Sequence, residues 1–148
     1  MDENIKQMVR NLIYDEELDE VKEKISIIDD PKALSLYVHN YNWDNGFDIP
    51  QAILDNSACD LSIALQIFYL ADGFAFLLDR TAKADNTRWY KFITRLYESI
   101  ISGKFPKGSI SFAVPLSKVQ IFKVKKNLND GERILIENID GECIDYNL

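Results

Sequence analysis

Carboxylates are the side chains of this sequence whose types and spacing could support catalysis or ligand binding. Asp44 and Asp48 lie on one polar turn, and Asp72 follows in the longest apolar stretch of the chain. Two carboxylates in one pocket can serve as a general acid and a general base. The sequence therefore leaves open an enzyme, or a protein that binds a small ligand, with a carboxylate site around Asp44, Asp48 and Asp72.

Histidine, zinc and phosphate chemistry lack their usual residue patterns. His39 is the single histidine, and no neighbour in the sequence provides the positioned partner that proton transfer needs. Together with Cys59 and Cys143 it does not have the close ligand spacing of a zinc site, and no glycine-rich phosphate loop is present. We therefore predict no catalytic residue, no metal and no cofactor, and favour a protein that is not an enzyme.

Charge is distributed unevenly along the 148 residues, whose formal net charge is −7. Residues 1–60 hold 14 acidic and five basic side chains, whereas residues 80–126 hold 11 basic and two acidic ones. An acidic surface of this kind attracts a basic partner. The alternative is that the charged segments are solvated faces that partly neutralise each other in the fold.

Basic residues after position 80 are interleaved with aromatic ones, as in Arg88-Trp89-Tyr90-Lys91, and such mixtures can bind nucleic acid. Trp89, however, lies on the same helical stripe as Ile93 and Leu96, which indicates a place in the core. The net acidic charge also opposes phosphate binding. We therefore do not expect nucleic acid as a partner.

Apolar spacing predicts a mainly α (α+β) fold of six to seven packed helices, in one domain over residues 1–148. Short turns between the helices favour stacked helical pairs, although no fixed-period repeat supports this strongly. Asp30 and Asp60 are expected to cap helices, and the helix from Asp60 to Ala71 should be central and buried nearly all round. Helical patterns cover residues 5–13, 18–28, 31–41, 49–54, 60–71, 74–78 and 86–100.

The end of the chain has a different character. A short β-rich run is expected over residues 110–114, and Asp140-Gly141 predicts a hairpin turn between residues 134–136 and 143–144. Residues 117–128 fit either a helix or a strand, and we favour the helix. At the Asp72-Gly73 break we expect Asp72 to cap the next helix and Gly73 to take a backbone angle closed to other residues.

Part of the sequence resembles a bacterial domain family of unknown function. The resemblance rests on the turn Tyr-Asn-Trp-Asp-x-Gly-Phe at residues 41–47, the pair Cys59-Asp60 and the segment Ala71-Asp72-Gly73. It is specific over residues 37–80 and looser through the Trp89 helix and residues 115–117. The resemblance implies a cytoplasmic bacterial protein, and it implies neither a reaction nor a catalytic residue.

The turn in this motif has two interpretations. In the architectural one, Trp43 and Phe47 fasten the turn to the core, and Asp44 and Asp48 cap helix ends. In the functional one, the turn is an exposed surface that binds a partner or a ligand. The candidate binding residues are Tyr41, Asn42, Trp43, Asp44, Asn45, Asp48 and Asp72.

The missing catalytic patterns and the uneven charge favour a non-enzymatic protein-binding module. Immunity proteins, which neutralise a toxin by covering its basic face with an acidic surface, are the nearest analogy. The chain begins without an export signal, and its longest apolar stretch is too broken to span a membrane, so we expect a cytoplasmic protein. The expected partner is a basic protein, and the sequence does not predict the oligomeric state.

Overall fold

The computed structural model describes residues 2–80 and 87–148. Within these ranges it contains eight α-helices, two 3-10 helices and no strand, so the mainly helical prediction is confirmed and the helix count exceeds six to seven. The helices are α1 (Glu3–Tyr14), α2 (Leu18–Ile27), α3 (Pro31–His39), η1 (Trp43–Asn45), α4 (Asp48–Asp55), α5 (Leu61–Leu70), α6 (Gly73–Leu78), α7 (Arg88–Ile101), α8 (Lys118–Lys125) and η2 (Asp130–Ile136).

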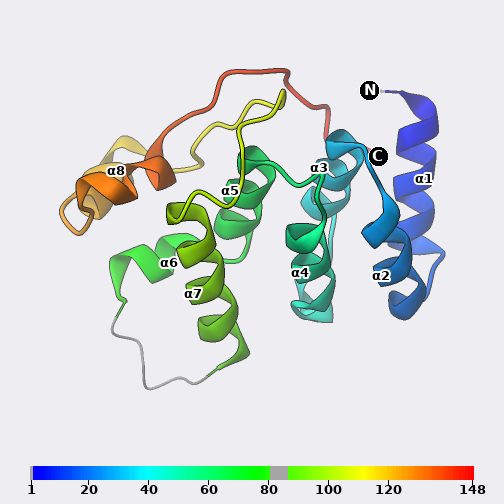
Figure 1. Cartoon of the computed structure of the whole chain (residues 1–148), viewed down its shortest axis with the longest axis horizontal. Helices are drawn as coiled ribbons and strands as arrows, with labels where there is room; N and C mark the ends of the chain where they lie inside the picture. The colour runs from blue at the N-terminus through cyan, green and yellow to red at the C-terminus, as the bar shows by residue number, and fades with distance from the viewer. Residues whose placement is uncertain (1, 81–86) are drawn as a thin grey trace.

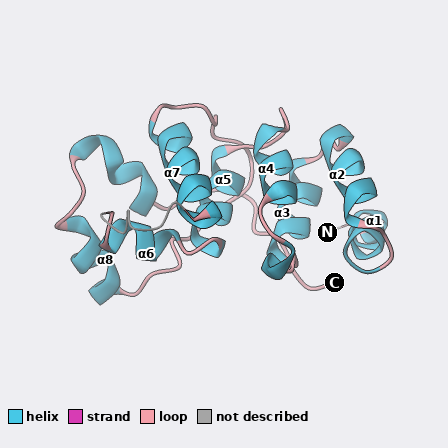
Figure 2. Cartoon of the chain, turned by 90° about the horizontal axis from the view of Figure 1, so that it is seen from below, coloured by secondary structure: helices cyan, strands magenta, loops and turns pink. Residues whose placement is uncertain are grey.

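The first five α-helices contact one another in alternation. Helix α1 packs on α3 and α3 on α5, whereas α2 packs on α4. Figure 2 shows the result as two rows, with α2 and α4 in one row and α1 and α3 in the other. This is the contact pattern of stacked helical pairs, in which neighbouring pairs together bury apolar stripes that no pair could bury alone.

Local capping explains where several helices begin. The Asp30 carboxylate accepts a hydrogen bond from the backbone N–H of Lys32, and Pro31 supplies a first residue that needs no donor. The Asp60 carboxylate accepts one from the N–H of Ile63 at the start of α5. Both caps were predicted. At the predicted start of α7, Asn86 lies outside the described residues, and Thr87 provides the cap.

Helix α5 is the centre of the apolar core, as predicted. Residues 61–65, Ile67 and Phe68 are buried, so nearly the whole circumference of the helix is covered. Helices α3, α6 and α7 all contact it. The predicted helix over residues 117–128 is also present as α8, which begins with a capping box between Ser117 and Gln120.

The break between α5 and α6 is built differently from our prediction. Asp72, and not Gly73, adopts the left-handed conformation, with φ of 66°. Asp72 stands at the N-cap position of α6, but its side chain makes no capping hydrogen bond. Gly73 is required for space, because a Cβ there would lie 2.3 Å from the Phe68 ring and 2.6 Å from the Phe68 carbonyl oxygen.

The predicted C-terminal β element is wrong for the residues that the structure describes. Residues 130–136 form η2, because the side chains of Asn129 and Glu132 each accept a hydrogen bond from the other's backbone N–H. The run at residues 110–112 makes only isolated bridges, one from Phe112 to Ile139 and one from Ile110 to Glu142. No hairpin forms around Gly141, whose backbone instead packs closely on residues 109–111.

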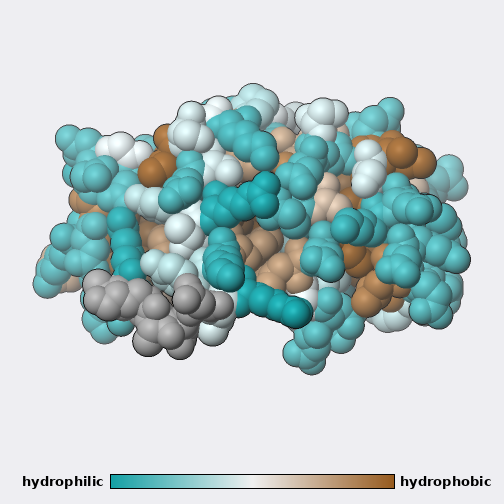
Figure 3. All heavy atoms as spheres, turned by 60° about the horizontal axis from the view of Figure 1, so that its bottom comes forward, coloured by the Kyte–Doolittle hydropathy of each residue, from teal (hydrophilic) through white to brown (hydrophobic). Residues whose placement is uncertain are grey.

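The last residues of the chain return over the helices. In Figure 1 the segment after η2 crosses from the α8 end to the α1 end, where both termini lie. Figure 3 shows one face of the molecule, on which hydrophilic groups predominate and apolar groups lie in separate patches. No helix among the described residues is long and apolar enough to cross a membrane.

Candidate functional site

The aromatic residues of the turn at residues 41–48 connect it to the core. Tyr41 is buried, and its hydroxyl donates a hydrogen bond of 2.7 Å to the Gly46 carbonyl oxygen. The ring of Trp43 meets that of Tyr41 edge-on at 5.3 Å, and Phe47 stacks on Phe92 of α7 at 4.7 Å. These contacts support the architectural interpretation for the aromatic half of the motif.

The polar half of the same turn faces solvent. Asn42, Asp44 and Asn45 are all exposed, and the Asn42 side chain accepts a hydrogen bond from the N–H of Asp44 at 3.0 Å. Gly46 closes the turn with φ of 89°, a conformation that favours glycine. Asp44 stands in the first turn of η1, where its carboxylate is available to solvent.

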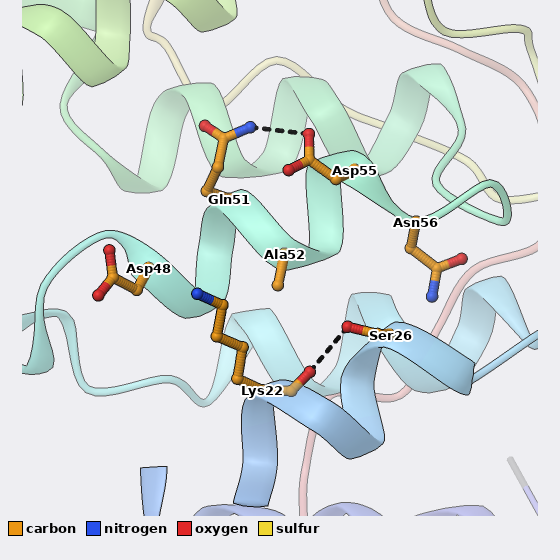
Figure 4. Close-up of a pocket in the computed structure, with 7 residues that line it drawn as sticks. All are labelled: Lys22, Ser26, Asp48, Gln51, Ala52, Asp55 and Asn56. Carbon is orange, nitrogen blue, oxygen red and sulfur yellow. Dashed lines mark hydrogen bonds between the residues drawn. The ribbon is translucent and has the colours of Figure 1, made fainter. Parts of the chain in front are cut away.

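Asp48 is the predicted residue that faces a groove. The groove lies between α2 and α4, has a volume of about 240 Å³ and is shown in Figure 4. Asp55 lies seven residues after Asp48, so the two carboxylates share one face of α4, two turns apart. Lys22 of α2 reaches into the groove from the opposite wall. The full lining is Lys22, Ser26, Asp48, Gln51, Ala52, Asp55 and Asn56.

Hydrogen bonds hold the walls of this groove in place. The Asn56 amide donates to the carbonyl oxygens of Ile25 and Ile28, each at 2.8 Å, and so joins the end of α4 to the end of α2. The Gln51 amide donates to the Asp55 carboxylate at 3.0 Å. Among the described residues, no ion pair or side-chain hydrogen bond engages Asp48, whose carboxylate is therefore free to bind another group.

Tyr41 is unsuited to proton transfer at neutral pH. Burial, with a smaller contribution from the charge of Asp48, raises the pKa of its hydroxyl to about 12. The hydroxyl is therefore protonated, and it is already committed to Gly46.

Asp72 lies in a different part of the molecule. It lines a hollow of about 460 Å³ together with Ala75, Asp79 and Trp89. The Trp89 indole is anchored there by a hydrogen bond to the Ala71 carbonyl oxygen. The structure thus places Asp48 beside Asp55 and Asp72 beside Asp79, and it does not bring Asp44, Asp48 and Asp72 together.

The structure also gives the positions of the cysteines, the histidine and the aromatic residues considered above. Cys59 is buried, whereas Cys143 and His39 are exposed, and the His39 ring stacks on Tyr146 at 4.3 Å. Within residues 2–80 and 87–148, no cluster of three or more His, Cys, Asp or Glu side chains could hold a metal ion. Phe92 is buried, so its ring is not available to stack on nucleic-acid bases, and Trp89 is half-buried.

Sequence reasoning missed a cavity with a volume of about 600 Å³, larger than the groove at Asp48. Its lining comes from α3, α5 and α6, and from two later segments that contribute Ser111, Phe112, Ala113, Pro115, Leu116, Gln120, Cys143, Ile144 and Tyr146. Sequence reasoning also missed Lys22 and Asp55 in the acidic groove. The seven-residue interval from Asp48 to Asp55 was the available signal for the second carboxylate, whereas no local pattern indicates a cavity built from distant segments.

Comparison with known proteins identifies a family and no activity. No curated protein and no solved structure matches the chain. The family match includes the turn at residues 41–48 and the segment Ala71-Asp72-Gly73. Residues 29–101, which run through α3 to α7, match the model of the family described as a domain of unknown function (DUF4274).

Proposed function

We propose that this protein is a non-enzymatic module that binds a basic protein through the acidic face of α2 and α4. The observation that carries the proposal is the groove in Figure 4, where Asp48 and Asp55 project from one wall. A lysine or arginine side chain of the partner would enter between the two carboxylates. Charge-assisted hydrogen bonds of this kind are stronger than those between neutral groups.

The α2 side of this face carries further carboxylates, although Lys22 lines the groove and Lys104 pairs with Asp55 at 3.9 Å. On α2, Asp19 and Glu23 are exposed and share a helix face with Lys22 and Ser26, because they lie three or four residues apart. Lys22 itself is exposed on a flexible stem. The partner's cation would therefore displace the Lys22 ammonium. It would then lie among carboxylates, which continue along α2.

The proposal includes the setting that the sequence predicts, which is the cytoplasm of a bacterium. An immunity-type role, in which the acidic face covers the basic face of a toxin, is its most specific form. Attraction between the opposite charges would accelerate association of the two proteins, and added salt would screen this attraction.

A charge-reversal experiment tests this function. The full chain is immobilised and exposed to host lysate at low salt, beside the double variants Asp48→Lys/Asp55→Lys and Glu137→Lys/Asp140→Lys. The second pair is the matched control, since it changes charge equally at exposed residues remote in sequence from the groove.

We expect mass spectrometry to find a basic protein that the wild-type chain and the control capture, and that the groove variant loses. Capture should also fall when salt is raised. Recovery of the same proteins by all three chains, or of none at low salt, would overturn the proposal.

A further inference from the structure

The apolar cavity beneath the returning C-terminal segment is independent of the acidic groove. One wall is formed by α5 and α6, which contribute Tyr69, Leu70 and Phe74. The rest of the lining is formed by Phe112 and its neighbours, and by Cys143, Ile144 and Tyr146 of the last segment. The cavity volume of about 600 Å³ lies within the range of roughly 300–1,000 Å³ that is typical of small-molecule sites.

Aromatic rings dominate the chemistry of the lining. Tyr69 and Phe112 pack against each other in the lining, with their rings nearly parallel and 6.0 Å apart. His39 and Tyr146 form a second stacked pair, 4.3 Å apart. Rings arranged in this way favour a flat aromatic guest, which can stack or meet a ring edge-on.

The charge of the lining determines the charge of the occupant. No carboxylate, ammonium or guanidinium group is present among the described side chains that line the cavity. An ion that entered would lose hydration without gaining a counterion. The lining is therefore complementary to an uncharged molecule.

Most polar groups of the lining are already engaged within the protein. The Tyr69 hydroxyl donates to the Leu135 carbonyl oxygen, and the Gln66 amide exchanges hydrogen bonds with Ser35. The Tyr146 hydroxyl lies 2.9 Å from the same Ser35 hydroxyl. An extended peptide would bring backbone groups that need partners here, so these contacts favour a compact small molecule over a protein segment.

We propose that this cavity is a binding site for an uncharged, largely aromatic small molecule. The guest packs against the rings of Tyr69, Phe112 and Tyr146, and beside Leu70, which also lines the cavity and is 39% exposed. Neither the family match nor the acidic groove assigns such a site, and binding here does not depend on the proposed protein partner.

The test uses N-phenyl-1-naphthylamine, an uncharged aromatic probe whose fluorescence rises in apolar surroundings. It is titrated into the full chain and into Leu70→Lys, which places an ammonium beside the cavity at a side chain that is 39% exposed. Leu78→Lys is the matched control, because Leu78 is 41% exposed and does not line this cavity. Circular dichroism confirms that both variants fold.

We expect saturable binding to the wild-type chain and to Leu78→Lys, and at least tenfold weaker binding to Leu70→Lys. A second readout needs no substitution. Cys143 lines the cavity and is exposed, so bound probe should slow its reaction with a thiol reagent. Equal binding by the three chains, fluorescence that never saturates, or an unchanged reaction rate at Cys143 would overturn the proposal.

Discussion

Burial separates the chemistry of the two cysteines. Cys59 is buried, and desolvation together with the neighbouring Asp60 charge raises the pKa of its thiol to about 12. Because the thiolate is the reactive form, Cys59 should be inert at pH 8, whereas the exposed Cys143 should react. We expect Ellman's reagent to titrate one thiol in the folded chain and two in urea. In Cys143→Ser, a fast-reacting thiol in the folded chain would contradict this assignment.

Asp60 combines a helix cap with a buried charge. One carboxylate oxygen accepts from the Ile63 N–H, whereas Oδ2 is buried without a hydrogen-bond partner and packs against Gly108. Burial raises the pKa of this carboxyl, although the backbone donors at the helix start lower it. The folded state therefore binds the proton more readily than the unfolded state does.

The sign of this shift gives a pH prediction. A raised carboxyl pKa contributes stability that is fully present below the unfolded value of about 3.9 and is lost as pH rises through the folded pKa. Asp60→Asn cannot titrate, so the unfolding free energy of the wild type should fall relative to this variant between pH 4 and 7. Urea unfolding at several pH values measures it, and a difference that is constant or grows with pH would refute the shift. Asp60→Ala, which also cannot titrate, should show the same trend with pH and should be about 1 kcal/mol less stable than Asp60→Asn because it lacks the cap.

At the scale of elements, one amide joins two helices of the same row, α4 and α2, at their C-terminal ends. Asn56 donates to the carbonyl oxygens of Ile25 and Ile28 at the end of α2 and accepts from the N–H of Ala58, so its whole side chain is used. We expect Asn56→Ala to lower the unfolding free energy by about 1–3 kcal/mol, since carbonyl groups lose their donor. Urea unfolding provides the measurement.

Two further substitutions sharpen that prediction. Asn56→Asp keeps the shape and the acceptor but turns an oxygen towards the two carbonyl groups, so it should cost at least as much as Asn56→Ala. Gln51→Ala, one turn earlier, removes only a bond to Asp55 and should change stability by less than about 0.5 kcal/mol. A neutral Asn56→Asp would show that the amide donors do not hold α2.

The sequence predicted helices where the signal was local. The caps at Asp30 and Asp60 and the burial of α5 follow from residues within a few positions of one another. The C-terminal strands failed because the apolar run at residues 134–136 was weighed without the capping box that begins at Asn129. Likewise, no pattern in the Asp72-Gly73 pair reveals that Phe68 occupies the space above Gly73.

The candidate site likewise has residues that a local pattern could predict and residues that only the tertiary structure brings together. Asp48 was predicted because it belongs to a compact polar turn, and the interval to Asp55 could have added the second carboxylate. Lys22 joins them only because α2 packs on α4, which the charge pattern does not reveal. The apolar cavity was beyond prediction for a stronger reason, since Tyr69 and Tyr146 are separated by most of the second half of the chain.

At the scale of the whole molecule, the C-terminal segment connects the ends of the fold. Lys6 of α1 forms an ion pair with Asp145 at 3.0 Å, and Lys32 of α3 forms one with Glu142 at 2.7 Å. Exposed pairs of this kind contribute little each, about 0–1 kcal/mol. Tyr146 is the stronger anchor, because its hydroxyl meets Ser35 while its ring packs on His39.

The anchor can be tested apart from the helices that it covers. Tyr146→Ala removes the ring and the hydroxyl together, so the segment after residue 139 should open while the contacts of α2 with α4 remain. Hydrogen exchange should therefore rise at residues 142–148, and Cys143 should react faster with thiol reagents, with little change in residues 18–55. Tyr146→Phe, which keeps the ring, should lower the free energy of opening the segment by only about 1 kcal/mol. Asn147→Ala is the control, because among the described residues the Asn147 side chain hydrogen-bonds only to Asp145, two positions earlier. If exchange rose equally in α2 and α4, the segment would be part of one cooperative unit with the stack, because opening it would then unfold the helices as well.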